Sequence, residues 1–110
     1  MDDRRFGARV EQVPDDVRLR MQGDLDGRAD ETLGSAYAEV AAIGPGRVTL
    51  DFHDVGYINS TGIALIVRLL ADARREGRGV RAVGLTPHYR EIFRITRLSD
   101  FMDIVEGDAA

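Results

Sequence analysis

The spacing of apolar residues switches repeatedly along this chain between the period of a strand and the period of a helix. In residues 17–21 apolar and polar side chains alternate, which is typical of a strand with one wet face. Residues 29–41 carry apolar side chains at helical spacing, and residues 47–52 return to strand-like alternation. A stronger helical stripe occupies residues 61–76. Because strands joined through helices pair in parallel with right-handed crossovers, this pattern favours an α/β fold.

Two further strands and a third helix complete the expected order. Residues 8–13 also alternate, and the turn 14–16, Pro-Asp-Asp, should join them to the next run as an antiparallel hairpin. Residues 80–83 form a short apolar run, and Thr86 followed by Pro87 is typical of a helix start. A helical turn near Ser99 and an edge strand at residues 104–105 would end the chain. We therefore expect one α/β domain with a mixed, largely parallel sheet of about four or five strands and about three or four helices.

The helix at residues 61–76 has apolar residues on more than one side. The side that faces the sheet is expected to carry Ile63, Ile66, Val67 and Leu70. Leu65 and Leu69 then fall on another side, where either a neighbouring helix covers them or they form an exposed apolar strip. An exposed strip here would be a docking surface for a partner. Residues 53–57, which precede the helix, are expected to form a loop.

Composition limits the functions open to this chain. Its 110 residues are 44% hydrophobic, enough for one domain with a real core. The net charge is −4, with arginines interleaved among acids, so we expect no nucleic-acid partner. The absence of cysteine excludes disulfides and thiolate metal sites. With no apolar run long enough to span a membrane and no signal-like start, we expect a cytoplasmic protein without a membrane partner.

The segment Asn59-Ser60-Thr61-Gly62 lies between a strand region and the strongest helix. In α/β folds, sites form where the carboxyl ends of strands meet the amino ends of helices. A phosphate on a hydroxyl at this position would be stabilised by unpaired amide N–H groups and by the helix dipole. The same residue types are ordinary helix caps. From the residues alone, a modified site and a structural cap both remain open.

Two more segments accompany this one in a recognisable order: Gly23-Asp24-Leu25-Asp26 before it, and Gly84-Leu85-Thr86-Pro87 after it. In this order and spacing the three segments resemble those of STAS domains of the anti-sigma-factor antagonist class. The similarity covers about residues 8–105. It implies a STAS domain at residues 8–106, a flexible N-terminal segment at 1–7 and a C-terminal tail at 107–110.

The resemblance implies a regulatory protein that binds a partner and is not an enzyme. In that class a serine is phosphorylated by a partner that is both a serine kinase and an anti-sigma factor, and a serine phosphatase reverses the modification. The unphosphorylated antagonist binds the partner and frees the sigma factor. By position the phosphoacceptor here is Ser60, with Thr61 as the alternative. The implied partner-binding residues are Asp24, Asp26, Asn59, Ser60, Thr61, Gly62, Leu65 and Arg68.

The chain departs from the family pattern at a few positions. Asn59 stands where Asp is usual, which keeps a helix cap but removes a charge. Ala64 and Arg68 occupy helix positions that are often Gly. Arg97 stands where Gly often ends the third helix, because Gly adopts the left-handed geometry more easily. No cofactor is expected, and the chain should be a monomer or a weak dimer.

The sequence allows two other functions to be considered for this domain. A structural STAS subunit of a signalling scaffold or transport complex would lack serine phosphorylation, and Asn59 keeps this alternative open. An enzyme with Ser60 as nucleophile would need an adjacent base. The two histidines, His53 and His88, offer no triad motif and no metal-like spacing, so we expect both at the surface, with no metal site. Asp24 and Asp26 should lie near Ser60, as partner contacts or, for Asp26, as a helix cap.

Overall fold

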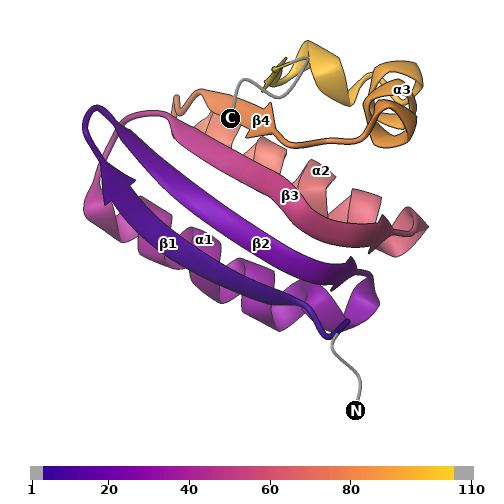
Figure 1. Cartoon of the computed structure of the whole chain (residues 1–110). Helices are drawn as coiled ribbons and strands as arrows, with labels where there is room; N and C mark the ends of the chain where they lie inside the picture. Colours follow the sequence, from indigo (N-terminus) through magenta and orange to yellow (C-terminus); the bar gives the residue numbers. More distant parts are fainter. Residues whose placement is uncertain (1–3, 106–110) are drawn as a thin grey trace.

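A computed structural model of the chain describes residues 4–105, and Figure 1 shows their arrangement. The strands are β1 (Gly7–Val13), β2 (Asp16–Leu25), β3 (Val48–Ile58), β4 (Val80–Val83) and β5 (Asp103–Ile104). The helices are α1 (Asp30–Ile43), α2 (Ser60–Arg75) and α3 (Pro87–Ile95), with short 3-10 turns η1 (Gly27–Ala29) and η2 (Leu98–Asp100). The order of these elements is the one expected from the apolar spacing.

The strands form one sheet in the order β1-β2-β3-β4-β5. The hairpin strand β1 is antiparallel to β2, and the remaining neighbours pair in parallel. Helices α1 and α2, which connect the parallel strands, cover the same face of the sheet (Figure 1). The expected mixed, largely parallel α/β domain is therefore confirmed.

Strand β3 is longer than the sequence pattern predicts. The expected loop at residues 53–57 is wrong, because β3 continues to Ile58 and pairs there with Leu25 of β2. The pairing is irregular at two points along β2, between Arg20 and Gln22 and between Gly23 and Asp24. At each of these points β3 has one residue more than β2, so β3 bulges locally and the ladder continues past the bulge. As a result, the ends of β2 and β3 lie side by side.

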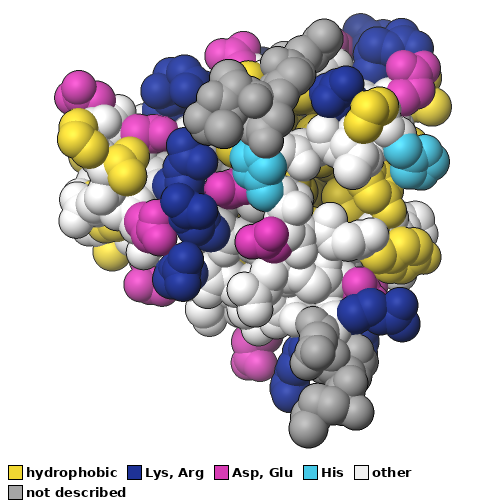
Figure 2. Space-filling model, in the orientation of Figure 1, with side chains coloured by type: hydrophobic (Ala, Val, Ile, Leu, Met, Phe, Trp, Pro, Cys, Tyr) yellow, Lys and Arg dark blue, Asp and Glu magenta, His cyan; other side chains and the backbone are white. Residues whose placement is uncertain are grey.

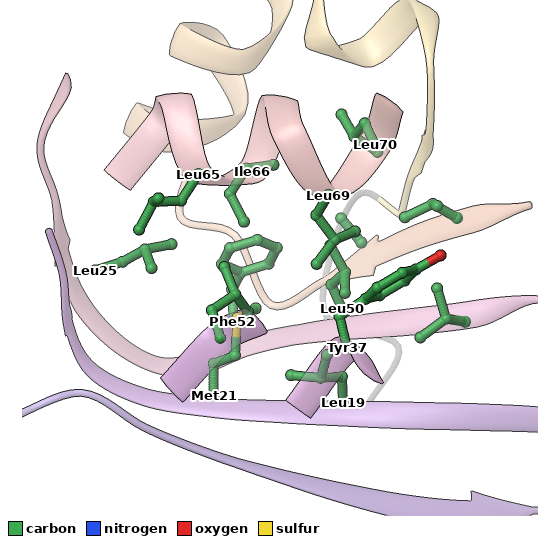
Figure 3. Close-up of a cluster of buried hydrophobic side chains, with 14 of the residues drawn as sticks. Leu19, Met21, Leu25, Tyr37, Leu50, Phe52, Leu65, Ile66, Leu69 and Leu70 are labelled. Carbon is green, nitrogen blue, oxygen red and sulfur yellow. The ribbon is translucent and has the colours of Figure 1, made fainter. Parts of the chain in front are cut away.

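The core lies between the sheet and the two covering helices. In Figure 3, Leu65, Ile66 and Leu69 point from α2 toward the sheet, and Leu65 lies above Leu25. Helix α3 joins this core through Phe93, whose ring meets the Phe52 ring edge to face at 5.8 Å between centroids.

The assignment of the sheet-facing side of α2 needs correction. Its buried residues are Gly62, Leu65, Ile66, Leu69, Leu70 and Ala73. Val67, which the apolar spacing predicts to face the sheet, is 46% exposed, and Ile63 is only partly buried. Leu65 and Leu69 are buried, because they point toward the sheet and share a small cleft with Leu33 and Tyr37 of α1. The exposed apolar strip at Leu65 and Leu69 therefore does not exist.

The first described residues pack against the sheet. Phe6 is buried and the Arg4 carbonyl accepts a hydrogen bond from the Asp24 N–H at 2.7 Å, so residues 4–6 pack against β2. The expected tail at 107–110 and the first three residues of the expected flexible segment 1–7 lie outside the described residues. None of the helices in residues 4–105 is long and apolar enough to cross a bilayer.

Candidate functional site

The end of β2 and the start of α2 are joined directly. The Asn59 N–H donates to the Leu25 carbonyl at 3.2 Å. Gly62, in the first turn of α2, lies so close to β2 that a Cβ added to it would stand 1.9 Å from the Leu25 carbonyl oxygen. Only glycine permits this approach without a shift of the backbone. The structure thus brings the Asp24–Asp26 segment beside the Asn59–Gly62 segment.

Asn59 caps α2, as the sequence suggested. Its side-chain oxygen accepts a hydrogen bond from the Gly62 N–H at 2.8 Å, and its carbonyl accepts from the Ile63 N–H at 2.9 Å. Ser60 and Thr61 follow in the first turn, and both are exposed. Within residues 4–105, no protein group accepts a hydrogen bond from the N–H of Ser60 or Thr61. These two donors and the helix dipole are available to an anion at the Ser60 hydroxyl.

The two acidic residues of the β2 end have local partners. Asp24 is 8% exposed, and its carboxylate lies 3.7 Å from the Arg4 guanidinium. Asp26 caps η1 by accepting a hydrogen bond from the Arg28 N–H at 2.9 Å. The Arg28 side chain also bonds this carboxylate, and these bonds lower the pKa of Asp26. Asp26 therefore caps a helical turn as expected, but that turn is η1, which leads into α1, and α1 itself has no side-chain cap.

Tyr89 is a member of this region that sequence reasoning missed. Its hydroxyl accepts a hydrogen bond from the Ile58 N–H at 2.9 Å, immediately before Asn59 and Ser60. Helix α3 is thereby tied to the end of β3. A tyrosine on the buried side of an amphipathic helix needs a hydrogen-bond partner for its hydroxyl. This requirement is the feature of the sequence that could have pointed to Tyr89.

The exposed side of α2 begins at Ser60. It continues through Ala64, Val67 and Ala71, which recur at helical spacing. Arg68 is also exposed, and it forms an ion pair with Asp30 at the start of α1. The apolar surface next to Ser60 is therefore made by Ala64 and Val67, whereas Leu65 is buried and cannot contact a partner in this structure.

The face of the sheet that the helices leave open is charged (Figure 2). Asp51 of β3 is nearly buried there, and its carboxylate lies 3.3 Å from Arg18 and 3.7 Å from Arg20. It also contacts the His53 ring at 2.7 Å and accepts a hydrogen bond from the His53 N–H at 3.0 Å. Burial raises the pKa of Asp51, but the bonds from His53 and Arg18 outweigh it and hold that pKa below its usual value. The apolar and polar spacing of the sequence does not predict this pairing.

Comparisons with known proteins agree on one family. The sequence profile of a family described as "Mlab, STAS domain" matches residues 8–106. The anti-sigma-B factor antagonist of Bacillus subtilis (strain 168) is 25% identical over 95 residues, which cover 86% of this chain and 86% of that protein.

Solved structures agree on the fold. An anti-sigma factor antagonist from Mycobacterium paratuberculosis has a TM-score of 0.77 at 20% identity, covering 96% of this chain and 90% of that one. The Bacillus cell fate determinant SpoIIAA in its phosphorylated form has a TM-score of 0.66 at 19% identity, covering 90% of this chain and 91% of that one.

Proposed function

Because the chain belongs to the STAS domain family, we propose that it is an anti-sigma-factor antagonist, a regulatory protein that controls transcription by binding an anti-sigma factor. The relative from Bacillus subtilis bears that name and is matched over most of both chains. Such a partner acts on sigma factors, so the protein would work in the cytoplasm. The observation that carries the proposal is the exposure of Ser60 at the first turn of α2. Its hydroxyl lies beside two backbone N–H groups that have no acceptor within residues 4–105.

The switch in this proposal is phosphorylation of Ser60. The anti-sigma factor would also be the serine kinase, and a serine phosphatase would reverse the reaction. The likeness to a solved structure in a phosphorylated form supports a modification on this fold. Asn59 supplies the same cap that an aspartate would, without placing a negative charge beside the incoming phosphate. Thr61 also carries an exposed hydroxyl and is the alternative acceptor.

The partner would dock on Ser60 and on the exposed side of α2. Ala64 and Val67 give this surface an apolar centre, and Arg68 gives it a charged margin. A kinase must reach the Ser60 hydroxyl, so its surface must lie against this turn of the helix. Asp26 would contribute from the loop after β2, whereas Asp24 is as buried as Leu65 at the end of β2 and would not touch the partner. Gly62 is buried, so its role is to hold α2 against β2 and not to touch the partner.

Phosphorylation would weaken binding without unfolding the domain. A phosphoserine carries a charge of about −1.5 to −2 near neutral pH. At an exposed helix N-terminus such a charge is favourable by roughly 0.3–1 kcal/mol. Repulsion from Asp24 and Asp26 is offset by their pairing with Arg4 and Arg28 and is screened by solvent. In the complex, by contrast, an unpaired phosphate covered by the partner would cost several kcal/mol.

The protein acts as a regulator and not as an enzyme. A serine nucleophile needs a hydrogen-bonded base. Within the described residues no histidine bonds to Ser60, and the His53 ring contacts Asp51 on the sheet face instead. The proposed chemistry at Ser60 is therefore supplied by the partner kinase, with this chain as substrate.

A pull-down from lysate of the native host, with phosphosite mapping of the bait, tests the proposal. Wild type should recover a protein with a kinase-type anti-sigma sequence and should carry one phosphate, which Ser60→Ala abolishes and Thr61→Ala leaves in place. Phosphate found consistently on Thr61 would show that Thr61, and not Ser60, is the phosphoacceptor. Recovery of a large assembly with no phosphate would favour the structural-subunit alternative.

Charge reversal on α2 tests the docking surface. Arg68→Glu should weaken binding of the recovered partner while leaving the thermal melt close to that of wild type. Arg75→Glu is the matched control, because it makes the same charge change near the far end of the same helix. Unchanged affinity for Arg68→Glu would show that the partner docks elsewhere.

A further inference from the structure

Within residues 4–105, no strand pairs with the outer edge of β1. Strand β1 is the first strand in the order β1-β2-β3-β4-β5 and is 7 residues long, whereas β5 at the opposite edge has 2 residues. In Figure 1 β1 lies at the margin of the described chain, with α1 behind it. An unpaired strand edge presents backbone N–H and C=O groups that can extend a sheet through another strand.

The charges on β1 are arranged symmetrically about its centre. Arg9 and Glu11 flank Val10, the middle residue of the strand. Side chains two residues apart lie on the same face, so both charges lie on the open face of the sheet. There they are registered opposite Arg20 and Arg18 of β2, respectively. The Arg9 side chain is 72% exposed, and its guanidinium lies 3.4 Å from the Glu11 carboxylate of the same strand.

We propose that β1 is a self-association edge, on which a second copy of this chain pairs antiparallel with Val10 opposite Val10. In this arrangement Arg9 of each copy faces Glu11 of the other. The two sheets become one continuous sheet about a two-fold axis. Each of the two symmetric contacts joins opposite charges across the strands, which is a stabilising cross-strand pair.

The same charges disfavour the neighbouring registers. A shift by two residues in one direction places Arg9 opposite Arg9, and in the other direction it places Glu11 opposite Glu11. Like charges directly opposite each other destabilise a sheet. A shift by one residue turns the Ala8 and Val10 side chains, which pack partly against the core, to the wrong face. The self-paired arrangement therefore has one favoured register.

Charged residues on an edge strand usually prevent pairing with other strands. The charges on β1 should prevent pairing with a strand of unrelated sequence. A second β1 that runs antiparallel, by contrast, places an opposite charge across from each of them. Glu11 already accepts a hydrogen bond from Arg20 at 2.9 Å, and this contact can persist while Arg9 of the second copy replaces the exposed Arg9 of the same strand at the Glu11 carboxylate. A single short strand provides a small interface, so the dimer should be weak and concentration-dependent.

Analytical ultracentrifugation of the full chain, from low micromolar to near-millimolar concentration, tests the proposal. Wild type should show a reversible monomer–dimer equilibrium. Arg9→Glu should weaken it about tenfold or more, because two attractive pairs become repulsive. Arg75→Glu, which makes the same charge change on α2, should dimerise like wild type.

Charge exchange makes the test specific to this edge. The double variant Arg9→Glu with Glu11→Arg restores opposite pairs and should dimerise again. When the single variant Arg9→Glu is mixed with the single variant Glu11→Arg, the two chains should form a heterodimer, although each single variant alone stays monomeric. Thermal melting confirms that each variant is folded. Wild type that stays monomeric throughout, or an exchange that fails to restore association, would overturn the proposal, and neither result bears on the role of Ser60.

Discussion

Replacement of Gly62 by alanine tests the contact that holds the candidate site together. The added Cβ would stand 1.9 Å from the Leu25 carbonyl oxygen, where ordinary van der Waals contact begins at 3.4 Å. The start of α2 must therefore retreat from β2 by about 1.5 Å, since a close-packed interior cannot absorb the overlap elsewhere. That movement also breaks the hydrogen bond from the Asn59 N–H to the Leu25 carbonyl.

The expected destabilisation follows from three contributions. Overpacking of this kind costs about 1–3 kcal/mol, and loss of the backbone hydrogen bond adds about 0.5–1.5 kcal/mol. The better helix propensity of alanine returns up to about 1 kcal/mol. The net loss in free energy of unfolding is about 2 kcal/mol, or about 10 °C in Tm for a domain of this size.

Gly34→Ala is the matched control, because Gly34 lies in α1 with nothing within 4 Å of its Cβ position. It should raise the free energy of unfolding by about 0.5–1 kcal/mol through helix propensity alone. Chemical denaturation and thermal melting measure both variants. A Gly62→Ala protein as stable as Gly34→Ala would refute the close approach of α2 to β2.

Three further changes probe separate parts of the structure. Arg97 adopts a left-handed backbone with φ 69° after α3, so Arg97→Gly should gain up to about 1 kcal/mol of stability despite losing the Arg97–Asp100 ion pair, and a lower Tm would contradict this. Tyr89→Phe should cost about 1–2 kcal/mol in denaturant unfolding, because the Ile58 N–H loses its acceptor; an unchanged midpoint would mean that water replaces it. Because the folded-state pKa of Asp51 is lowered, its stabilisation is complete above the ordinary aspartate pKa and is lost as the pH falls through the lower folded value. Asp51→Asn should thus be less stable than wild type at neutral pH and should converge toward it in acid, whereas parallel pH profiles would exclude this role.

The order of elements could be predicted because each strand and helix has a distinct apolar period. The hairpin alternation, the stripe of α1 and the Thr86-Pro87 start of α3 each correspond to an element in the structure. Likewise, Asn59 was expected to cap α2 and does so, because the cap depends only on local sequence.

The buried side of α2 could not be chosen from periodicity, because apolar residues occur nearly all round the helix. Leu65 and Val67 are equally apolar, yet one is buried and the other exposed. The position of α1 and the close approach of Gly62 to β2 decide which of the two is buried. Both are features of the tertiary structure, which local sequence does not determine. The buried Asp51 was missed for a similar reason, since its partner Arg18 comes from a neighbouring strand.

The most direct test of the proposed switch is a calorimetric titration of the recovered anti-sigma partner with unphosphorylated protein and with protein phosphorylated at Ser60. The account predicts that phosphorylation weakens binding by orders of magnitude, because each 1.4 kcal/mol lost is a tenfold loss of affinity. The Tm of the isolated protein should change by only a few degrees, since the phosphate is stabilised at the start of α2. Ser60→Asp should reproduce part of the loss, having one charge and less bulk. Equal affinity of the two forms, or a large fall in Tm that accounts for the lost binding, would contradict the account.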